Sequence, residues 1–160
     1  MIDNKKQWFE LWFDSPLYHI LYKNRNDEEA HLFIDSILKY LDINAGTVLD
    51  LACGKGRHAH YLAEKKLDVV GLDLSKESIQ YAADTYQLPN LEFYVHDMRL
   101  PFRMNYFNYI FNFFTSLGYF NDLRDNEKVF ESMHAGLKED GYILIDFMNT
   151  EKVINNLVPR

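Results

Sequence analysis

The chain has 160 residues, of which 48% are hydrophobic and 26% charged, and its formal net charge is −7. This length and composition predict one compact domain with its own core, and the negative charge disfavours nucleic acid as a partner because phosphates are repelled. One cysteine allows no intramolecular disulfide, and we identify neither a signal peptide nor an apolar stretch of about 20 residues that could span a membrane, so a cytoplasmic location is expected.

Residues 1–46 are predicted to form a helical cap over the rest of the domain. Aromatic side chains are dense in residues 8–22, and a serine before Pro16 predicts a short helix from Leu17. Large aromatics ahead of the first core strand favour a lid over a site, although plain packing on the sheet is the alternative. Residues 27–41 have the apolar period of a helix. As a lid, the segment would bring to the substrate Tyr18, His19, Tyr22 or Arg25.

The central pattern is a buried strand that runs into a glycine-rich loop. Residues 47–51 are apolar and partly β-branched, as expected for a strand of a parallel sheet, and they include Asp50. Ala52, Gly54 and Gly56 follow. Their small size lets a ligand approach the backbone, and glycine reaches positive φ at little cost, so the chain can turn sharply into the next helix. Open α/β sheets hold their ligands at this edge.

Acidic residues end the neighbouring strands as well. Asp73 is the last residue of the second apolar strand. Its spacing in the sequence from Gly56 suits a carboxylate that accepts hydrogen bonds from the ribose hydroxyls of a cofactor. Nicotinamide sites share that feature. Asp50, however, precedes the glycines, where it would repel a pyrophosphate and attract an amino group. Asp97 follows the third strand and could accept a hydrogen bond from an adenine amine. Three acids around one loop favour a cofactor that carries a positive charge.

The rest of the chain alternates strands and helices. The predicted helices are 57–66, 76–85 with Ser75 as its N-cap, one from Asp122, and 149–158. The predicted strands are 68–73, 91–95, 106–114 and 142–147. Residues 99–105 contain proline and show no period, so they are predicted as a loop, and Asp140-Gly141 as a turn. This order predicts an α/β fold with a doubly wound, Rossmann-like parallel sheet and helices on both faces.

These motifs resemble the class I S-adenosylmethionine-dependent methyltransferases, in particular the small stand-alone bacterial type, from about residue 47 to residue 149. In that family an acid, small residues and two glycines form the loop, and residues 111–120 look like its fourth-strand motif. The resemblance implies the strand order 3-2-1-4-5, ribose at Asp73 and adenine near Asp97. The cofactor-binding residues that it implies are Asp50, Ala52, Cys53, Gly54, Gly56, Asp73, Leu74, Asp97, Met98 and Asn112.

The resemblance also implies a reaction, the in-line transfer of the sulfonium methyl group, with S-adenosyl-L-homocysteine as the product. Asn112 is not followed by the prolines typical of enzymes that methylate base amines, which favours a small-molecule acceptor. No metal is expected, because His58 and His60 point to different faces of their helix. No general base is assigned; the candidates are His19, His58 and Tyr119. The predicted substrate-binding residues are Tyr18, Tyr22, Arg25 and Tyr119.

Two alternative functions remain open, and the sequence also predicts a homodimer. A nicotinamide-dependent oxidoreductase is one alternative, and a cofactor-binding fragment without catalysis is another. The family's antiparallel strands after the fifth strand have no counterpart here, so we expect residues 47–160 to form a cofactor-binding domain truncated after that strand. The exposed edge of the fifth strand and residues 153–158 then predict a homodimer.

Overall fold

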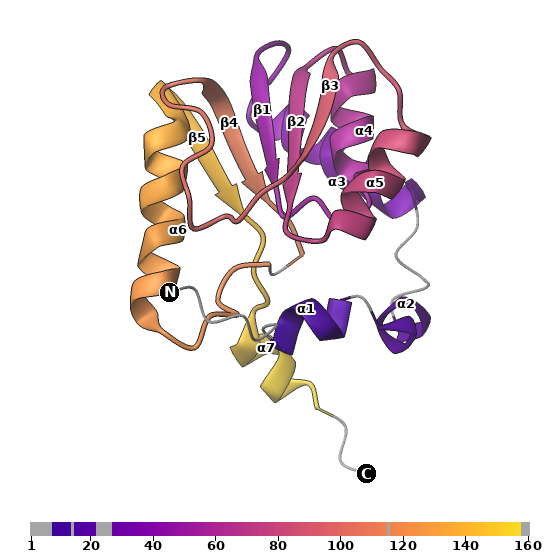
Figure 1. The fold of residues 1–160 in the computed structure, drawn as a ribbon, viewed down its shortest axis with the longest axis vertical. Helices are drawn as coiled ribbons and strands as arrows, with labels where there is room; N and C mark the ends of the chain where they lie inside the picture. The colour runs from indigo at the N-terminus through magenta and orange to yellow at the C-terminus, as the bar shows by residue number, and fades with distance from the viewer. Residues whose placement is uncertain (1–7, 14, 22–26, 115, 158–160) are drawn as a thin grey trace.

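The computed structural model describes residues 8–13, 15–21, 27–114 and 116–157. Its centre is a parallel five-stranded sheet with the order β3-β2-β1-β4-β5 (Figure 1), which confirms the predicted order. The strands are β1 (Thr47–Leu51), β2 (Asp68–Asp73), β3 (Leu91–Val95), β4 (Phe107–Asn112) and β5 (Leu137–Ile145). The order reverses between β1 and β4, and ligands of such sheets bind where the strand order reverses, at the carboxyl ends.

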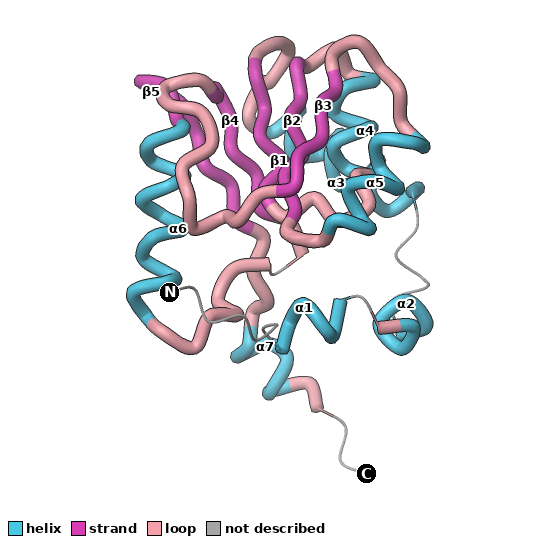
Figure 2. Tube along the Cα trace, in the orientation of Figure 1, coloured by secondary structure: helices cyan, strands magenta, loops and turns pink. Residues whose placement is uncertain are grey.

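Four helices cover the two faces of the sheet (Figure 2). They are α3 (Asp27–Tyr40), α4 (Arg57–Glu64), α5 (Lys76–Thr85) and α6 (Leu123–Gly136). On the face of α3 and α4, Ile34 and Leu62 pack with Val48 of β1. On the opposite face, Met133 of α6 packs with Leu49 of β1. Because neighbouring residues of a strand point to opposite faces, β1 is buried on both sides.

Side chains at the helix starts explain two of the helix boundaries. The hydroxyl of Ser75 accepts a hydrogen bond from the backbone N–H of Ser78 at 3.2 Å, which caps α5 as predicted. The carboxylate of Asp122 accepts from the N–H of Arg124 at 2.9 Å and caps α6. The segment between β3 and β4 contains no helix, so the predicted loop is confirmed.

The fifth strand differs from its prediction. It begins at Leu137, directly after α6, and not at Tyr142. The predicted turn at Asp140 lies within the strand, with Asp140 at φ 60°, next to a shift in the register with β4. Sequence reasoning missed this feature because a bulge with a left-handed residue and a turn have the same local signature.

The remaining helices lie beyond the carboxyl ends of the strands (Figure 1). They are α1 (Trp8–Phe13), α2 (Pro16–Leu21) and α7 (Thr150–Asn155). The helix α1 was not predicted, α2 lies where a short helix was expected from Leu17, and α7 is shorter than the helix expected at residues 149–158. The ring of Phe9 in α1 lies 5.5 Å from that of Phe120, in the segment after β4. The N-terminal segment therefore lies at the predicted ligand edge, and the boundary at residue 46 stays a prediction.

Candidate functional site

The loop between β1 and α4 has left-handed backbone at alternate residues. Ala52 has φ 63°, Gly54 φ 55° and Gly56 φ 80°. A Cβ on Gly56 would lie 2.6 Å from the ring of Phe93 in β3, so packing as well as conformation requires glycine there. A Cβ on Gly54 would meet no atom within 4 Å, because this residue borders open space. The loop thus turns tightly and leaves room beside Gly54.

Asp73 ties the end of β2 to this loop. Its Oδ2 accepts a hydrogen bond from the N–H of Gly54 at 2.8 Å, and its Oδ1 accepts from the N–H of Ser75 at 2.8 Å. The structure therefore brings together the loop and the acid that were predicted to share a ligand.

Asp50 is a buried acid under the same loop. Its side chain is 1% exposed, and its Oδ2 has no hydrogen-bond partner among the described residues. Burial, followed by the charge of Asp73, raises the pKa of Asp50 from 3.8 to about 7. A carboxyl group in this state is poised between its neutral and ionised forms near neutral pH.

The thiol of Cys53 interacts electrostatically with both of these acids. Its side chain is buried, and its backbone N–H donates to the carbonyl of Leu72 at 2.9 Å. Burial, and then the charges of Asp50 and Asp73, raise the pKa of its thiol well above the ordinary value. The thiol is therefore neutral and unsuited to act as a nucleophile.

The polar side chains at the ends of β3 and β4 have partners within the fold. Asp97, after β3, forms an ion pair with Arg99 at 2.6 Å. Asn112, at the end of β4, is fully buried and donates from Nδ2 to the carbonyl of Leu51 at 2.8 Å, which links β4 to β1. Met98 packs on the core cluster that faces α6, and Leu74 is 39% exposed beside Asp73. Their predicted cofactor contacts remain predictions.

The candidate substrate residues are only partly described. The ring of Tyr119 contacts Trp8 at 5.4 Å and Phe13 at 5.4 Å, so Tyr119 lies under α1. Tyr18 and His19 belong to α2, whose backbone alone is described at these positions, and the predicted contacts of Tyr22 and Arg25 fall outside the described residues. Among the described side chains, the rings of α1 contact Tyr119, and the lid over the substrate stays a prediction.

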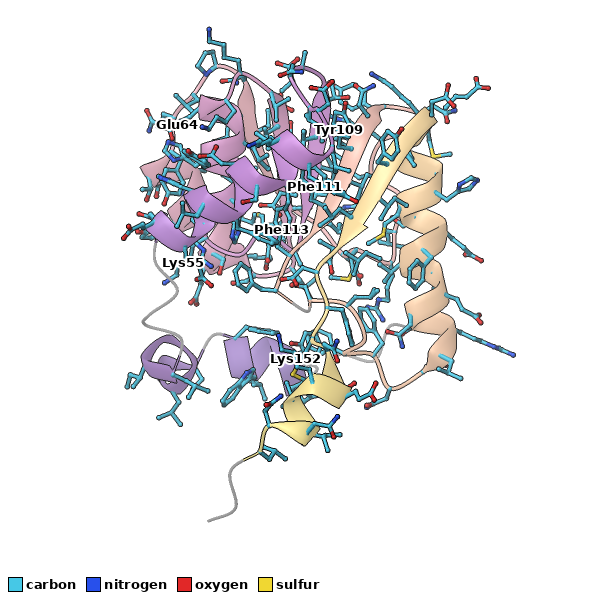
Figure 3. The ribbon with its side chains drawn as sticks, turned by 180° about the vertical axis from the view of Figure 1, so that it is seen from behind. Lys55, Glu64, Tyr109, Phe111, Phe113 and Lys152 are labelled. Atoms are coloured by element: carbon cyan, nitrogen blue, oxygen red, sulfur yellow. The ribbon has the colours of Figure 1, made fainter. Side chains whose placement is uncertain are left out.

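His58 occupies a buried position behind the loop. It is 5% exposed, and its ring lies 5.0 Å from the rings of both Phe113 and Phe114. Figure 3 shows Phe113 nearer the ligand edge than Phe111, with Lys55 at a similar level. A histidine enclosed by aromatic rings is poorly placed to exchange protons with a substrate, because a general base must reach the proton that it removes.

The sequence analysis did not single out two residues at the carboxyl-end edge of the sheet. Phe114 has φ 57°, and its N–H donates to Oδ2 of Asp146 at 3.1 Å, which links the ends of β4 and β5. A non-glycine residue in this region is uncommon and is often found near functional sites. Arg99 is the second. Neither has a sequence signal, since each depends on a partner distant in the chain or on a local conformation.

Other kinds of site are not seen in the described part of the chain. It contains no group of three His, Cys, Asp or Glu side chains that could hold a metal ion. None of its helices is long and apolar enough to cross a membrane. Two shallow hollows lie away from the glycine loop, one beside Asp35 and Lys65, the other where α6 meets β5. The chemistry of the loop and its acids, and not the depth of these hollows, marks the candidate site.

A family model described as a methyltransferase domain matches residues 43–158, which include the whole sheet and the glycine loop. The chain belongs to this methyltransferase family. Its curated relatives include YqeM of Bacillus subtilis (strain 168), which is provisionally named a methyltransferase and is 30% identical over 129 residues, covering 78% of this chain and 52% of YqeM. The chain spans between about half and three fifths of the length of three curated relatives that it matches.

Two further methyltransferases are similar to the chain. The dTDP-3-amino-3,4,6-trideoxy-alpha-D-glucopyranose N,N-dimethyltransferase of Streptomyces venezuelae is 26% identical over 135 residues, covering 82% of this chain and 56% of that protein. A TehB-like SAM-dependent methyltransferase from Corynebacterium glutamicum ATCC 13032 Kitasato has a TM-score of 0.62 at 23% identity, covering 78% of this chain and 68% of that one. This last similarity establishes the shared fold.

The residues present fit the cofactor of the family, S-adenosyl-L-methionine. The unpartnered, buried oxygen of Asp50 suits a site that receives positive charge. The open space at Gly54 lets a ligand reach the backbone, and the carboxylate of Asp73 lies beside it, where it accepts the hydrogen bond from the N–H of Gly54. The family match favours methyl transfer over the nicotinamide alternative.

Proposed function

We propose that the chain binds S-adenosyl-L-methionine at the glycine loop and transfers its methyl group to a small-molecule acceptor. The observation that carries this proposal is the placement of Asp50 and Asp73, near the carboxyl ends of the adjacent strands β1 and β2, beside a loop whose Gly54 borders open space. Membership of the methyltransferase family supports the reaction class. When bound, the cofactor would supply an activated methyl group on a positively charged sulfur.

The two acids beside the loop would hold the two ends of the cofactor. Asp73 would accept hydrogen bonds from the ribose hydroxyls while it keeps those from Gly54 and Ser75. Asp50 would serve the amino-acid end, directly or by fixing the loop, because its ionised form is favoured by a nearby positive charge.

The protein would promote methyl transfer mainly by positioning the acceptor and by excluding water from the site. An acceptor lone pair would attack the methyl carbon as the carbon–sulfur bond breaks, and the bonding electrons would leave with sulfur as a neutral thioether. Such a reaction needs the two groups held in line in a dry site. The ring of Phe9 contacts those of Tyr119 and Phe120 at this edge, and the three rings would exclude water there.

A small-molecule acceptor is supported by two observations. The net charge of −7 opposes binding of nucleic acid, and one relative is named for its action on a nucleotide-linked amino sugar. We also propose a cytoplasmic location, supported by a single, buried cysteine that forms no disulfide among the described residues. Recovery of the native protein only from a secreted or membrane fraction would contradict the location.

Calorimetry with the purified chain tests the cofactor proposal directly. Saturable binding of S-adenosyl-L-homocysteine is expected, with no binding of nicotinamide dinucleotides under the same conditions. The reverse pattern would overturn the proposal. Transfer of labelled methyl groups to a panel of small amines, phenols and acids would then identify the acceptor. The same panel with a C-terminally extended version would separate a catalytic domain from a cofactor-binding fragment.

We further propose that a second copy of the chain covers the free edge of β5. Among the described residues this strand pairs only with β4, and exposed apolar side chains continue from it into α7: Tyr142 at 59%, Ile143 at 38%, Phe147 at 55%, Val153 at 44% and Ile154 at 65%. Unblocked apolar edges recruit other strands. Light scattering at tens of micromolar should give a dimer that Ile143→Lys dissociates, and a wild-type monomer with slowly exchanging amides at residues 143–145 would refute the proposal.

A further inference from the structure

Asp146 is an acid at the carboxyl edge of the sheet, two strands away from the glycine loop. It follows the last residue of β5, and its N–H donates to the carbonyl of Asn112, the last residue of β4, at 2.9 Å. The side chain of Asn112 donates in turn to the carbonyl of Leu51, at the end of β1. Hydrogen bonds thus tie the ends of β1, β4 and β5 together, and they fix Asp146 relative to the loop that follows Leu51.

The carboxylate of Asp146 is only partly used by the fold. Its Oδ2 accepts a hydrogen bond from the N–H of Phe114 at 3.1 Å. In the part of the chain that the structure describes, no donor or cation pairs with its Oδ1. An asparagine would hold Phe114 equally well, because one side-chain oxygen is enough to accept one N–H. The packing of the described residues therefore requires neither the charge nor the second oxygen of Asp146.

Phe114, which Asp146 holds, has an unusual backbone. Its φ of 57° is seldom adopted by residues other than glycine, and such conformations are often found near functional sites. Its ring lies 5.0 Å from that of His58 and 4.9 Å from the guanidinium carbon of Arg57, both in α4. Through Phe114, Asp146 is therefore linked to the helix that follows the glycine loop.

The methyl acceptor would approach over the ends of β4 and β5. The acids proposed to hold the cofactor, Asp50 and Asp73, belong to β1 and β2, and ligands of such sheets lie where the strand order reverses, here between β1 and β4. The other side of that reversal remains for the acceptor. Figure 1 shows the segments after β4 and β5 running from this edge toward α1 and α7. They meet where a Cβ on Gly118 would lie 3.7 Å from the ring of Phe147.

We propose that Asp146 binds the methyl acceptor through an amine, so that the protein methylates nitrogen. This inference rests on the proposed function. The lone pair of the neutral amine would form the new nitrogen–carbon bond as the carbon–sulfur bond breaks. The bonding electrons leave with sulfur, and the positive charge moves from sulfur to nitrogen. A carboxylate beside that nitrogen accepts its N–H and stabilises the charge as it develops, whereas it repels an acceptor that is itself a carboxylate.

The ligand sinefungin tests this charge without knowledge of the acceptor. It is an analogue of S-adenosyl-L-homocysteine in which a carbon with an amine replaces the sulfur, so its cation lies where methyl transfer takes place. In calorimetry with the full chain, the wild type should bind sinefungin about tenfold or more tightly than S-adenosyl-L-homocysteine, because a carboxylate attracts a cation strongly in a partly dry site. Asp146→Asn should reduce this preference to less than about threefold.

Control variants separate the charge of Asp146 from its structural contact. Asp146→Asn keeps an acceptor for the N–H of Phe114, so its affinity for S-adenosyl-L-homocysteine should stay within about threefold of wild type. Asp42→Asn makes the same change before β1, at the opposite edge of the sheet, where Asp42 accepts from Nδ2 of Asn44 at 3.1 Å. It should keep the full preference. Thermal unfolding shows whether each variant is folded, and if Asp146→Asn is not, Asp146→Ser decides the question.

Matched acceptors test the chemical class. Transfer of labelled methyl groups is measured for benzylamine, benzyl alcohol and benzoate, which share a ring and differ in the reacting group. The wild type should methylate benzylamine about tenfold or more faster than the other two, and Asp146→Asn should lower that rate about tenfold or more, because charge stabilisation in the transition state is lost.

The outcomes are distinct. A wild type that binds S-adenosyl-L-homocysteine but does not prefer sinefungin overturns the inference, and so does a preference in Asp146→Asn within about twofold of wild type. Transfer to benzyl alcohol or benzoate without transfer to benzylamine also overturns it. A wild type that does not bind S-adenosyl-L-homocysteine refutes the proposed function itself, and with it this inference. Loss of the preference in Asp146→Asn, with Asp42→Asn unaffected, supports it even if benzylamine proves too small to be methylated.

Discussion

The buried carboxyl group of Asp50 should make the stability of the ligand-free protein fall as the pH rises through neutrality. Its pKa is 3.8 in an ordinary environment and about 7 in the fold, where it is 1% exposed. The folded state thus binds the proton more tightly than the unfolded state does. The stabilisation is fully present below about pH 4 and is lost as the pH rises through about 7.

The size of the effect follows from that difference in pKa. Each pKa unit corresponds to about 1.4 kcal/mol, so the full contribution is about 4 kcal/mol, of which about 2–3 kcal/mol is lost between pH 5 and pH 8. Asp35, Asp97 and Asp125 have lowered pKa values, so their contributions vary below about pH 4 and stay constant in this window. The interval from pH 5 to pH 8 therefore isolates Asp50 among the shifted carboxyl groups.

Asp50→Asn provides the matched comparison, since asparagine has the same shape and no titration. Urea unfolding of both proteins at pH 5, 6, 7 and 8 should show the free energy of unfolding of the wild type falling relative to the variant by about 2–3 kcal/mol. Parallel pH profiles, within about 0.5 kcal/mol, would refute the reasoning, because Asp50 would then ionise equally easily in both states. Saturating S-adenosyl-L-methionine should flatten the wild-type profile if its amino group favours the ionised form.

Four other outcomes can be measured with single variants or with the wild type. Asp50→Asn should lose affinity for S-adenosyl-L-methionine and keep that for adenosine; equal losses would count against its place at the amino-acid end. Asp73→Ala should weaken binding of S-adenosyl-L-homocysteine about 30-fold or more, because hydrogen bonds to a charged group contribute about 1.5–3 kcal/mol each; a change below threefold in calorimetry contradicts the ribose contact. Gly56→Ala, whose Cβ would lie 2.6 Å from Phe93, should destabilise the fold by at least about 2 kcal/mol more than Gly54→Ala, which meets no neighbour, and equal urea midpoints would dispute this packing. The two tryptophans of the chain both lie in α1, so intrinsic fluorescence should change on ligand binding if α1 is a lid, and an unchanged spectrum at saturation would argue for plain packing.

The sequence alone determined the parts of this protein that depend on neighbours in the chain. The glycines after Asp50 and the capping serine at position 75 act within a few residues, so their spacing was sufficient to predict the loop and the start of α5. The strand order followed from the family resemblance, which these local motifs carried.

Only the tertiary structure decided the features that join distant segments. Arg99 meets Asp125 across 26 residues, Tyr119 lies under an N-terminal helix, and His58 is enclosed by rings that follow β4. The start of β5 at Leu137 likewise depends on its register with β4. The period of a sequence shows which face of an element is buried but not which residue it meets there, because packing and hydrogen-bond partners are selected only when all the layers are assembled.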